Sequence, residues 1–372
     1  MAKSFLLAGG GTAGHVNPLL ATAAELTSRG HRVTVLGTLE GLEQDLVPRS
    51  GLPLLVVPRV PMPRRPSGDL LRFPGRWRAA IAAAKDAIRA TDADAVVGFG
   101  GYVSTPAYVA ARRLGVPIVV HEGNARPGMA NKLGARLTAH VAATFAHTPL
   151  PHAREVGLPL RSEITDLAAT LADPQQRTDA RAMARMTLGW PADAPVVLVT
   201  GGSQGAASLN AAVEGAVKTL VEHGIFVLHA TGQDKSSGAQ RALAALPREL
   251  QERYCVHEYL HDMPTALAAA DAVACRSGAG TVAETTAMGI PALYVPLPHG
   301  NGEQALNAAN AVQAGAAELM RDEDLTAQSL ILAVERMVLD ADVAQSMRAA
   351  AGTVGIADGA VRLADMIEAA AL

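Results

Sequence analysis

Cysteine, aromatic residues and net charge are all scarce in this chain. Two cysteines, Cys255 and Cys275, make no disulfide framework and no zinc cluster, which fits a reducing compartment. Aromatic residues are 3% of the chain, and 32 basic against 35 acidic side chains give a net charge of −3. Little is therefore available for stacking on nucleic-acid bases or for holding phosphate backbones. We expect no nucleic-acid partner.

Long apolar runs are also missing. No stretch offers the roughly 18 uncharged apolar residues that a membrane helix needs. The apolar run before Gly9 is too short for the core of a signal peptide. We therefore expect a cytoplasmic chain whose membrane contact is peripheral.

What the chain does have is length, apolar residues and repeated strand-helix alternation. Its 372 residues, 49% of them hydrophobic, are about two and a half times the usual domain length. An apolar strand followed by GGGTAG opens the sequence, and a second one followed by GGSQGA begins at about residue 195. Helices are expected at residues 17–29 and 105–114, among others. This rhythm indicates an α/β protein with parallel sheets.

We predict two Rossmann-like domains, with parallel sheets facing a central cleft. The first covers residues 1–161 and takes back a terminal helix at about 352–372, and the second covers residues 162–351. Ligands of such sheets bind beyond the carboxyl ends of the strands, so the residues that follow each strand are the site candidates.

The first glycine loop matches GxGxxG through Gly9, Gly11 and Gly14. This match alone is weak evidence of a dinucleotide-binding site. A nicotinamide dinucleotide would also need an acid after the second strand, where only Glu40 and Glu43 stand, a little late. The alternative is a tight turn that serves packing alone. Against that alternative, His15 follows the loop where a side chain would point into the cleft.

A second set of candidates follows the strands of the later half. The loop from Gly201 to Gly205 carries Ser203, whose hydroxyl suits a phosphate oxygen. After another strand come Ser277 and Gly278, then a helix opened by Gly280 and Thr281 and expected to carry Glu284 in its first turn. Glu284 either holds a ribose diol or only complements the helix dipole, and the residues leave these alternatives even.

Further polar residues crowd other strand ends. Those of the later half suit a sugar: His299, Asn301, Glu303, Gln304 and Asn307. Those of the first half are Gly100, Gly101, Tyr102, Ser104, His121, Glu122 and Asn124. Each could be only a loop or a helix cap, but their convergence favours a site. Asp92 and Asp94 precede their strand and do not make a metal site, so Arg161 and helix N-termini are left to meet leaving-group charge.

The ordered motifs GGGTAGH, GFGGYVS, HEGNARPGMANK, VGLPLR, VTGGSQGA, YLHDM and CRSGAGTVAE with PHGNGEQALNA resemble the MurG family of bacterial glycosyltransferases, family 28. The resemblance implies a GT-B fold without a metal or other cofactor. It also implies inverting transfer of N-acetylglucosamine from UDP-N-acetylglucosamine (UDP-GlcNAc) to the muramoyl 4-hydroxyl of lipid I, giving lipid II. The donor would bind mainly to the later half and the lipid acceptor to the first half.

Residue roles follow from the resemblance together with the strand-end positions. His15 is the candidate base and Glu122 its rival. The expected donor-binding residues are Thr12, Gly14, Asn124, Arg161, Ser203, Leu260, Met263, Ser277, Gly278, Thr281, Glu284 and Gln304. The expected acceptor-binding residues are Gly11, Gly101, Tyr102 and Asn131. Three positions depart from the family pattern, namely Gly123, Leu158 and Glu303, and put finer acceptor contacts in doubt.

The stretch from residue 59 to residue 78 suits an anionic membrane surface, because five arginines are interleaved with Leu70, Leu71, Phe73 and Trp77. These arginines are Arg64, Arg65, Arg72, Arg76 and Arg78. The alternative is that these apolar residues fold onto their own domain. Other functional readings are a GT-B transferase with a different lipid or natural-product acceptor, a nicotinamide oxidoreductase, and a sensor that binds a sugar nucleotide without turnover.

Overall fold

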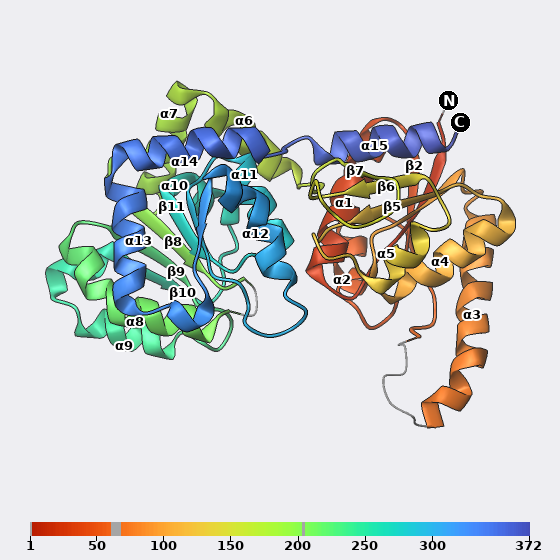
Figure 1. Ribbon diagram of the computed structural model, residues 1–372, viewed down its shortest axis with the longest axis horizontal. Coiled ribbons are helices and arrows are strands. Elements are labelled where there is room, and N and C mark those ends of the chain that lie inside the picture. The colour runs from red at the N-terminus through yellow and green to blue at the C-terminus, as the bar shows by residue number, and fades with distance from the viewer. Residues whose placement is uncertain (1, 61–67, 203–204) are drawn as a thin grey trace. The chain divides into compact units, whose positions relative to one another are not determined.

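The computed structural model describes residues 2–60, 68–202 and 205–372, with side chains described from residue 73 onward after the first gap (Figure 1). The chain divides into two compact units. One contains residues 1–162 and 358–372, and the other contains residues 163–357. Each is described by itself below.

The first unit is built on a seven-stranded parallel sheet with strand order β3-β2-β1-β4-β5-β6-β7. The strands are β1 (Ser4–Ala8), β2 (Arg32–Gly37), β3 (Leu54–Val56), β4 (Ala95–Gly98), β5 (Ile118–Glu122), β6 (His140–Ala143) and β7 (Ala153–Glu155). The helices are α1 (Ala13–Ser28), α2 (Glu43–Arg49), α3 (Gly68–Ala90), α4 (Gly101–Leu114), α5 (Met129–Gly134) and α15 (Gly359–Ala370).

Both faces of this sheet are covered, so its central strands are apolar throughout. Successive side chains of β1 point to opposite faces. Leu6 lies in the core cluster shared with α3 and α4, whereas Phe5 lies in the cluster shared with α1 and α15. The terminal helix α15 is held to α1 by ion pairs from Arg29 to Asp365 and Glu368. The C-terminal helix therefore packs into the core of the unit that contains the N-terminus (Figure 1).

The second unit has a six-stranded parallel sheet with strand order β10-β9-β8-β11-β12-β13. The strands are β8 (Val196–Thr200), β9 (Phe226–Ala230), β10 (Tyr254–His257), β11 (Ala272–Cys275), β12 (Ala292–Tyr294) and β13 (Ala317–Leu319). The helices are α6 (Ser162–Ala172), α7 (Pro174–Thr187), α8 (Ala207–Glu222), α9 (Ser237–Ala245), α10 (Met263–Ala269), α11 (Ala279–Ala287), α12 (Glu303–Ala314), α13 (Ala327–Leu339) and α14 (Ala341–Val354), with 3₁₀ turns at Arg248–Arg253 and Asp322–Asp324.

Several expected boundaries were wrong. Helix α1 begins at Ala13 rather than residue 17, and α4 begins at Gly101 rather than residue 105. In both cases the first turn contains a single buried valine, Val16 or Val103, which is too little to show apolar periodicity. Strands β6, β7 and β13 were not predicted. They lie at or next to a sheet edge, and their sequences HVAA, ARE and AEL contain small and polar residues in place of a continuous apolar run. Within the described residues, no helix is long and apolar enough to cross a bilayer.

Candidate active site

His15 lies in the first turn of α1, beyond the carboxyl end of β1, and its ring is oriented by the glycine loop. Its Nδ1 is 3.1 Å from the carbonyl oxygen of Gly10 and 3.2 Å from Oγ1 of Thr12. A carbonyl oxygen can only accept, so this contact places the proton of the neutral ring on Nδ1. Nε2 is then left as the acceptor. A side chain at Gly100 would put its Cβ 3.0 Å from Nε2, so glycine there leaves room beside that nitrogen.

The anion-binding backbone of the first glycine loop is occupied by the chain itself. Glu43, fully buried at the start of α2, accepts hydrogen bonds from the Gly11 N–H at 2.8 Å and from both the N–H and the hydroxyl of Thr38. Burial opposes the charged form, yet these hydrogen bonds outweigh it and lower the pKa of Glu43. Glu40 is exposed and pairs with Arg59. The Glu43 carboxylate is thus bonded within its own loop and is not available to a ribose, as a dinucleotide-binding site would require.

Glu122, the other candidate base, is buried at the end of β5 and holds its own loop. Its carboxylate accepts from the N–H groups of Asn124 (2.9 Å) and Gly128 (3.0 Å) and from Nδ2 of Asn131 (3.0 Å). Burial raises the pKa of Glu122, and these hydrogen bonds offset only part of that effect. The amide of Asn131 also donates to the carbonyl of His121 and accepts from the hydroxyl of Tyr108. Asn131 is thus buried in a network of the unit's own groups.

The remaining first-unit candidates lie on the exposed rim of the same edge. Gly101 has φ +78°, and a Cβ there would lie 2.7 Å from the carbonyl oxygen of Gly10, so the start of α4 can approach the glycine loop only without a side chain. Tyr102 is exposed, with the Arg59 guanidinium 5.3 Å from its ring centroid. The other rim candidates are Gly11, Thr12 and Gly14, which are exposed, and Asn124, which is half-buried.

In the second unit, the start of α11 offers unused hydrogen-bonding groups. Its N-cap residue is Gly278, which has no side chain to cap the helix, so among the described residues its first N–H groups are open to a ligand or to water. Ser277, directly after β11, is fully buried, and its hydroxyl has no hydrogen-bond partner among the described residues. Gly278 is the N-cap residue, and Thr281 stands in the first turn. This is the kind of helix terminus that binds a phosphate group.

Glu284 lies in the second turn of α11, not the first as expected, because the helix begins at Ala279. An interaction with the helix dipole falls off within the first turn, so this position weakens the reading in which Glu284 only complements the dipole. Its side chain is half-buried, and its charge, after burial, contributes to raising the pKa of the Cys275 thiol. The carboxylate therefore sits at the sheet edge rather than out in solvent.

The segment after β12 leads into α12, where Gln304 and Asn307 face this edge. Oε1 of Gln304 accepts from the Leu297 N–H at 2.9 Å, which ties the helix to the preceding loop. Nδ2 of Asn307 lies 3.4 Å from the Ser277 carbonyl oxygen. Asn301 and Glu303 bond each other within the loop. The structure thus brings Ser277, Gln304 and Asn307 to one edge.

Leu260 and Met263 lie beyond the end of β10 and are half-buried. Met263 opens α10, whose N-terminus is capped by Asp262. Ser203 lies outside the described residues. Near it, Gly205 has φ +65°, and a Cβ there would meet the Thr231 carbonyl oxygen at 2.1 Å, so the second glycine loop is locked against β9. Arg161 is exposed at the end of the first unit.

The comparisons with known proteins match both units. Residues 5–143 match the glycosyltransferase family 28 N-terminal domain, and residues 196–363 match the family 28 C-terminal domain. The chain belongs to glycosyltransferase family 28. It is therefore a glycosyltransferase, and the expected family and enzyme class are confirmed.

Two similar family 28 relatives share one printed name, UDP-N-acetylglucosamine–N-acetylmuramyl-(pentapeptide) pyrophosphoryl-undecaprenol N-acetylglucosamine transferase. The protein from Cutibacterium acnes is 48% identical over 93% of this chain and 91% of its own. That from Frankia casuarinae is 48% identical over 100% of this chain and 96% of its own. Both matches run through the two units.

Among solved structures, Acinetobacter baumannii MurG is 28% identical, with a TM-score of 0.79 and coverage of 99% of both chains. A UDP-GlcNAc 2-epimerase from Neisseria meningitidis is 15% identical with a TM-score of 0.69 over 99% of this chain and 100% of its own, which shows the fold alone. The predicted fold class, two Rossmann-like domains of GT-B type, is confirmed.

Two further residues, to which the quoted motifs assigned no role, also belong to this edge. Arg276 is buried beside Ser277 and donates to the Val295 and Pro296 carbonyls, to Asp322 and to the hydroxyl of Ser208. It thereby ties the start of α8 to the exit of β12. Tyr259 is 55% exposed next to Leu260, where an aromatic face could stack on a base. No periodicity identifies either one, since their roles depend on which strand ends meet.

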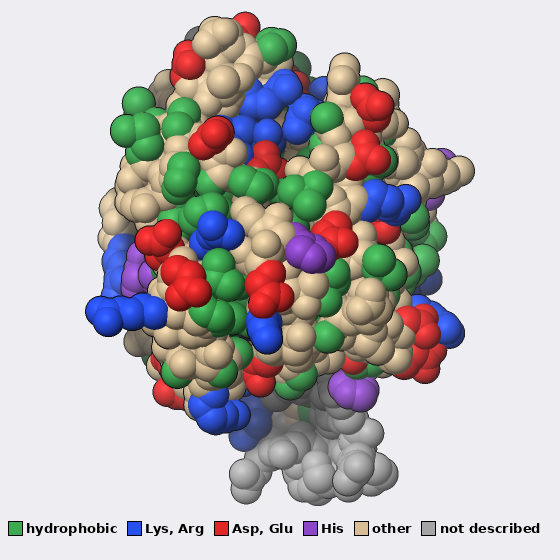
Figure 2. Space-filling model, turned by 90° about the vertical axis from the view of Figure 1, so that its left-hand side faces the viewer, with side chains coloured by type: hydrophobic (Ala, Val, Ile, Leu, Met, Phe, Trp, Pro, Cys, Tyr) green, Lys and Arg blue, Asp and Glu red, His purple; other side chains and the backbone are tan. Residues whose placement is uncertain are grey.

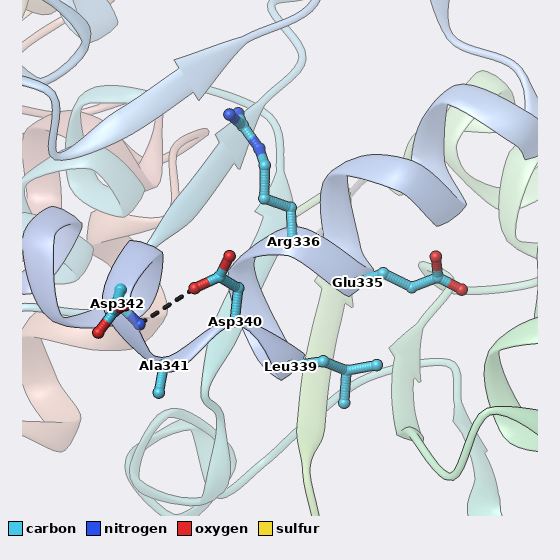
Figure 3. A pocket seen from close by; sticks show the side chains of 6 residues that line it. All are labelled: Glu335, Arg336, Leu339, Asp340, Ala341 and Asp342. Carbon is cyan, nitrogen blue, oxygen red and sulfur yellow. Dashed lines mark hydrogen bonds between the residues drawn. The ribbon is translucent and has the colours of Figure 1, made fainter.

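A hollow at the corner between α13 and α14 does not belong to the candidate site (Figure 3). It is lined by Glu335, Arg336, Leu339, Asp340, Ala341 and Asp342, and none of these is a predicted site residue. Asp340 there accepts from the Asp342 N–H and caps α14. Among the described residues, no group of three or more His, Cys, Asp or Glu is placed to hold a metal ion.

Proposed function

We propose that this chain transfers N-acetylglucosamine from UDP-GlcNAc to the 4-hydroxyl of the muramoyl sugar of lipid I, undecaprenyl-diphosphoryl-N-acetylmuramoyl-pentapeptide, giving lipid II with inversion at the anomeric carbon. The observation that carries the proposal is 48% identity to transferases of that name over 93% or more of the chain. The polar groups at the carboxyl edge of each sheet, taken separately, support it.

The donor is assigned to the second unit. The uncapped start of α11, with Ser277, Gly278 and Thr281, would receive the diphosphate, whose charge the positive helix end stabilises as UDP leaves. Glu284 would accept from the ribose hydroxyls and Gln304 would contact the sugar. Leu260 and Met263 would lie against the uracil, with Ser203 on the phosphates. From the first unit, Thr12, Gly14, Asn124 and Arg161 would complete donor binding.

His15 is the proposed general base. With the proton of the neutral ring held on Nδ1 by Gly10, Nε2 can take the proton of the attacking 4-hydroxyl as the new glycosidic bond forms and the bond to UDP breaks. Glu122 is less suited, because its carboxylate already accepts three hydrogen bonds and is buried. We assign Glu122 to holding the loop in place.

The acceptor is assigned to the rim of the first unit at Gly11, Gly101 and Tyr102. Asn131 would act through Glu122 and Tyr108, since its amide is used inside the unit. Two of the departures from the family pattern are neighbours: a Cβ at Gly123 would lie 3.7 Å from Cδ1 of Leu158. They therefore form one local change. The third, Glu303, is bonded to Asn301 and leaves Gln304 in place.

Membrane contact at the cytoplasmic face is proposed through the start of α3. Phe73 and Trp77 stack with ring centroids 5.9 Å apart, and both are half-buried. Trp77 packs against the core cluster under α3, which favours an internal role for that residue. The side chains of Leu70 and Leu71 lie outside the described ones. If Leu70→Glu with Leu71→Glu leaves binding to phosphatidylglycerol vesicles unchanged, this contact is wrong.

The test of the function is an assay with radiolabelled UDP-GlcNAc and a short-chain lipid I analogue. We expect a labelled disaccharide product and one UDP released per product. Release of UDP without disaccharide, or transfer only to an acceptor that lacks the muramoyl sugar, would contradict the proposal.

A further inference from the structure

Four arginines gather on the second unit, between α7 and α14. Arg177, Arg181 and Arg185 are spaced four residues apart and therefore share one face of α7. Arg348 comes from α14, and its charge acts on both Arg181 and Arg177. Figure 2 shows Lys and Arg side chains gathered in a recess in the upper part of its face, the end of the molecule where Figure 1 places α7 and α14.

One carboxylate pairs with two of these four arginines. Asp271 pairs with Arg181 at 3.0 Å and with Arg185 at 2.8 Å, and it also accepts from the Val196 N–H. Arg185 is satisfied, because it donates in addition to the carbonyls of Ala269 and Ala192. Asp271 and Arg185 thus form the structural part of the cluster and join the starts of β8 and β11.

The other three arginines keep unused hydrogen-bond donors, although Arg181 already pairs with Asp271. Arg177 donates to the carbonyls of Leu171 and Ala172 and has no ion pair among the described residues. The Nε atoms of Arg181 and Arg348 are buried and have no hydrogen-bond partner in the described part of the chain. Burial, together with the neighbouring arginines, lowers the pKa of Arg181 to about 10 and lowers that of Arg348. An anion between them would reverse both effects.

The place of the cluster separates it from the donor site. Asp271 directly precedes β11, and its partner Val196 is the first residue of β8, so the cluster lies at the amino ends of strands whose carboxyl ends lead to α11 and α8. Four or five residues of extended strand, about 15 Å, stand between the two edges. The family 28 donor site, at the carboxyl edge, does not require these side chains.

We infer that Arg177, Arg181 and Arg348 form a second binding site, for a phosphate group. Planar guanidinium groups from two helices suit a tetrahedral oxyanion that can accept two hydrogen bonds from each, and three positive charges favour a doubly charged phosphate over chloride. The phosphate could belong to a free anion or to a phospholipid head group. This inference does not depend on the proposed function.

The experiment measures binding of inorganic phosphate and of pyrophosphate by calorimetry to the full chain saturated with UDP, which fills the donor site. The double variant Arg177→Gln with Arg348→Gln is compared with Arg241→Gln, which removes an exposed arginine from α9. We expect at least tenfold weaker binding in the double variant and wild-type binding in the control. In a second arm, vesicles of phosphatidylglycerol and of phosphatidylcholine replace the soluble anions. Vesicle binding that the double variant loses would identify a phospholipid head group as the source of the phosphate, and binding of the soluble anions alone would identify a free anion.

Thermal melting separates a binding site from a structural cluster. Without added anion, Arg348→Gln should melt no lower than wild type, since it removes a repelled charge, and it should lose most of the stabilisation that phosphate gives. Arg348→Lys should retain part of it. Equal phosphate binding in the double variant and wild type, or equal stabilisation by sodium chloride at the same ionic strength, would overturn the proposal.

Discussion

The carboxyl edges of the two sheets differ in how far their polar groups are satisfied from within. In the first unit, Glu43 fills the glycine loop and the Glu122–Asn131–Tyr108 network occupies the loop after β5. In the second, the N-cap residue of α11 is Gly278, which has no side chain, and the Ser277 hydroxyl has no partner among the described residues. The first edge has a comparable group in the buried Thr144 hydroxyl after β6, so the difference concerns the glycine loop and the loop after β5. Polar groups that are already hydrogen-bonded within the chain can hold the imidazole ring of His15 in a fixed orientation. Polar groups without such partners gain hydrogen bonds when an anion binds.

This difference teaches that two similar strand-loop-helix motifs need not bind similar ligands. The GxGxxG pattern at Gly9, Gly11 and Gly14 has the appearance of a phosphate loop, but the Gly11 N–H is already bonded to a buried carboxylate. We therefore assign catalysis to the first edge and donor binding to the second.

The largest expected effect is that of His15→Ala. Loss of a general base should lower kcat by about 10²- to 10⁴-fold. The dissociation constant of UDP-GlcNAc, measured by calorimetry, should stay within a factor of about three, because the donor is held mainly by the other unit and His15 is not among its proposed contacts. Wild-type turnover in His15→Ala would remove His15 from the mechanism and return Glu122 as the candidate.

A second prediction uses one buried histidine in each unit. Burial lowers the pKa of His121 and of His229 to about 4. Between about pH 6.5 and pH 4 the unfolded chain binds these protons and the folded chain does not, so stability falls as the pH falls through that window. Each histidine accounts for up to about 3 kcal/mol. Urea unfolding of His229→Gln and His121→Gln should show a flatter pH dependence than wild type, and an unchanged slope in both would refute the assignment.

Glu43→Gln should weaken the hydrogen bonds inside the first glycine loop and lower the stability of the chain by a smaller amount. Exchanging the carboxylate for an amide weakens charge-assisted hydrogen bonds from Gly11 and Thr38, at a cost of about 1.5–3 kcal/mol. Because the pKa of Glu43 is lowered, its stabilisation is present above about pH 4.5 and is lost as the pH falls through the folded-state value. At pH 7 the variant should therefore be less stable than wild type. On acidification it should lose less stability than wild type does. Donor affinity should not change, and a loss of donor affinity would contradict the division of roles.

Much of the fold could be predicted because buried parallel strands are continuous apolar runs, as in Phe5 to Ala8 and Val196 to Thr200. The role of Glu43 could not. Its side chain fits because Gly10, Gly37 and Gly41 lack a Cβ at that point, which only the folded chain reveals. The site residues after β11 could be named from sequence, but not the turn that carries Glu284, since nothing in AGTVAE marks Ala279 as the first residue of the helix.

The basic cluster illustrates the same limit. The four-residue spacing of Arg177, Arg181 and Arg185 is visible in the sequence and predicts a shared helix face. Arg348 stands far along the chain, and only the packing of α14 against the unit brings its charge to them. Long-range proximity of like charges leaves no local pattern.

The most direct test of this account is the dissociation constant of UDP-GlcNAc for Glu284→Ala, measured by calorimetry alongside His15→Ala. The account predicts at least tenfold weaker binding in Glu284→Ala, together with near-normal binding in His15→Ala. Wild-type affinity in Glu284→Ala, with weakened affinity in His15→Ala, would contradict it by placing the donor on the first unit.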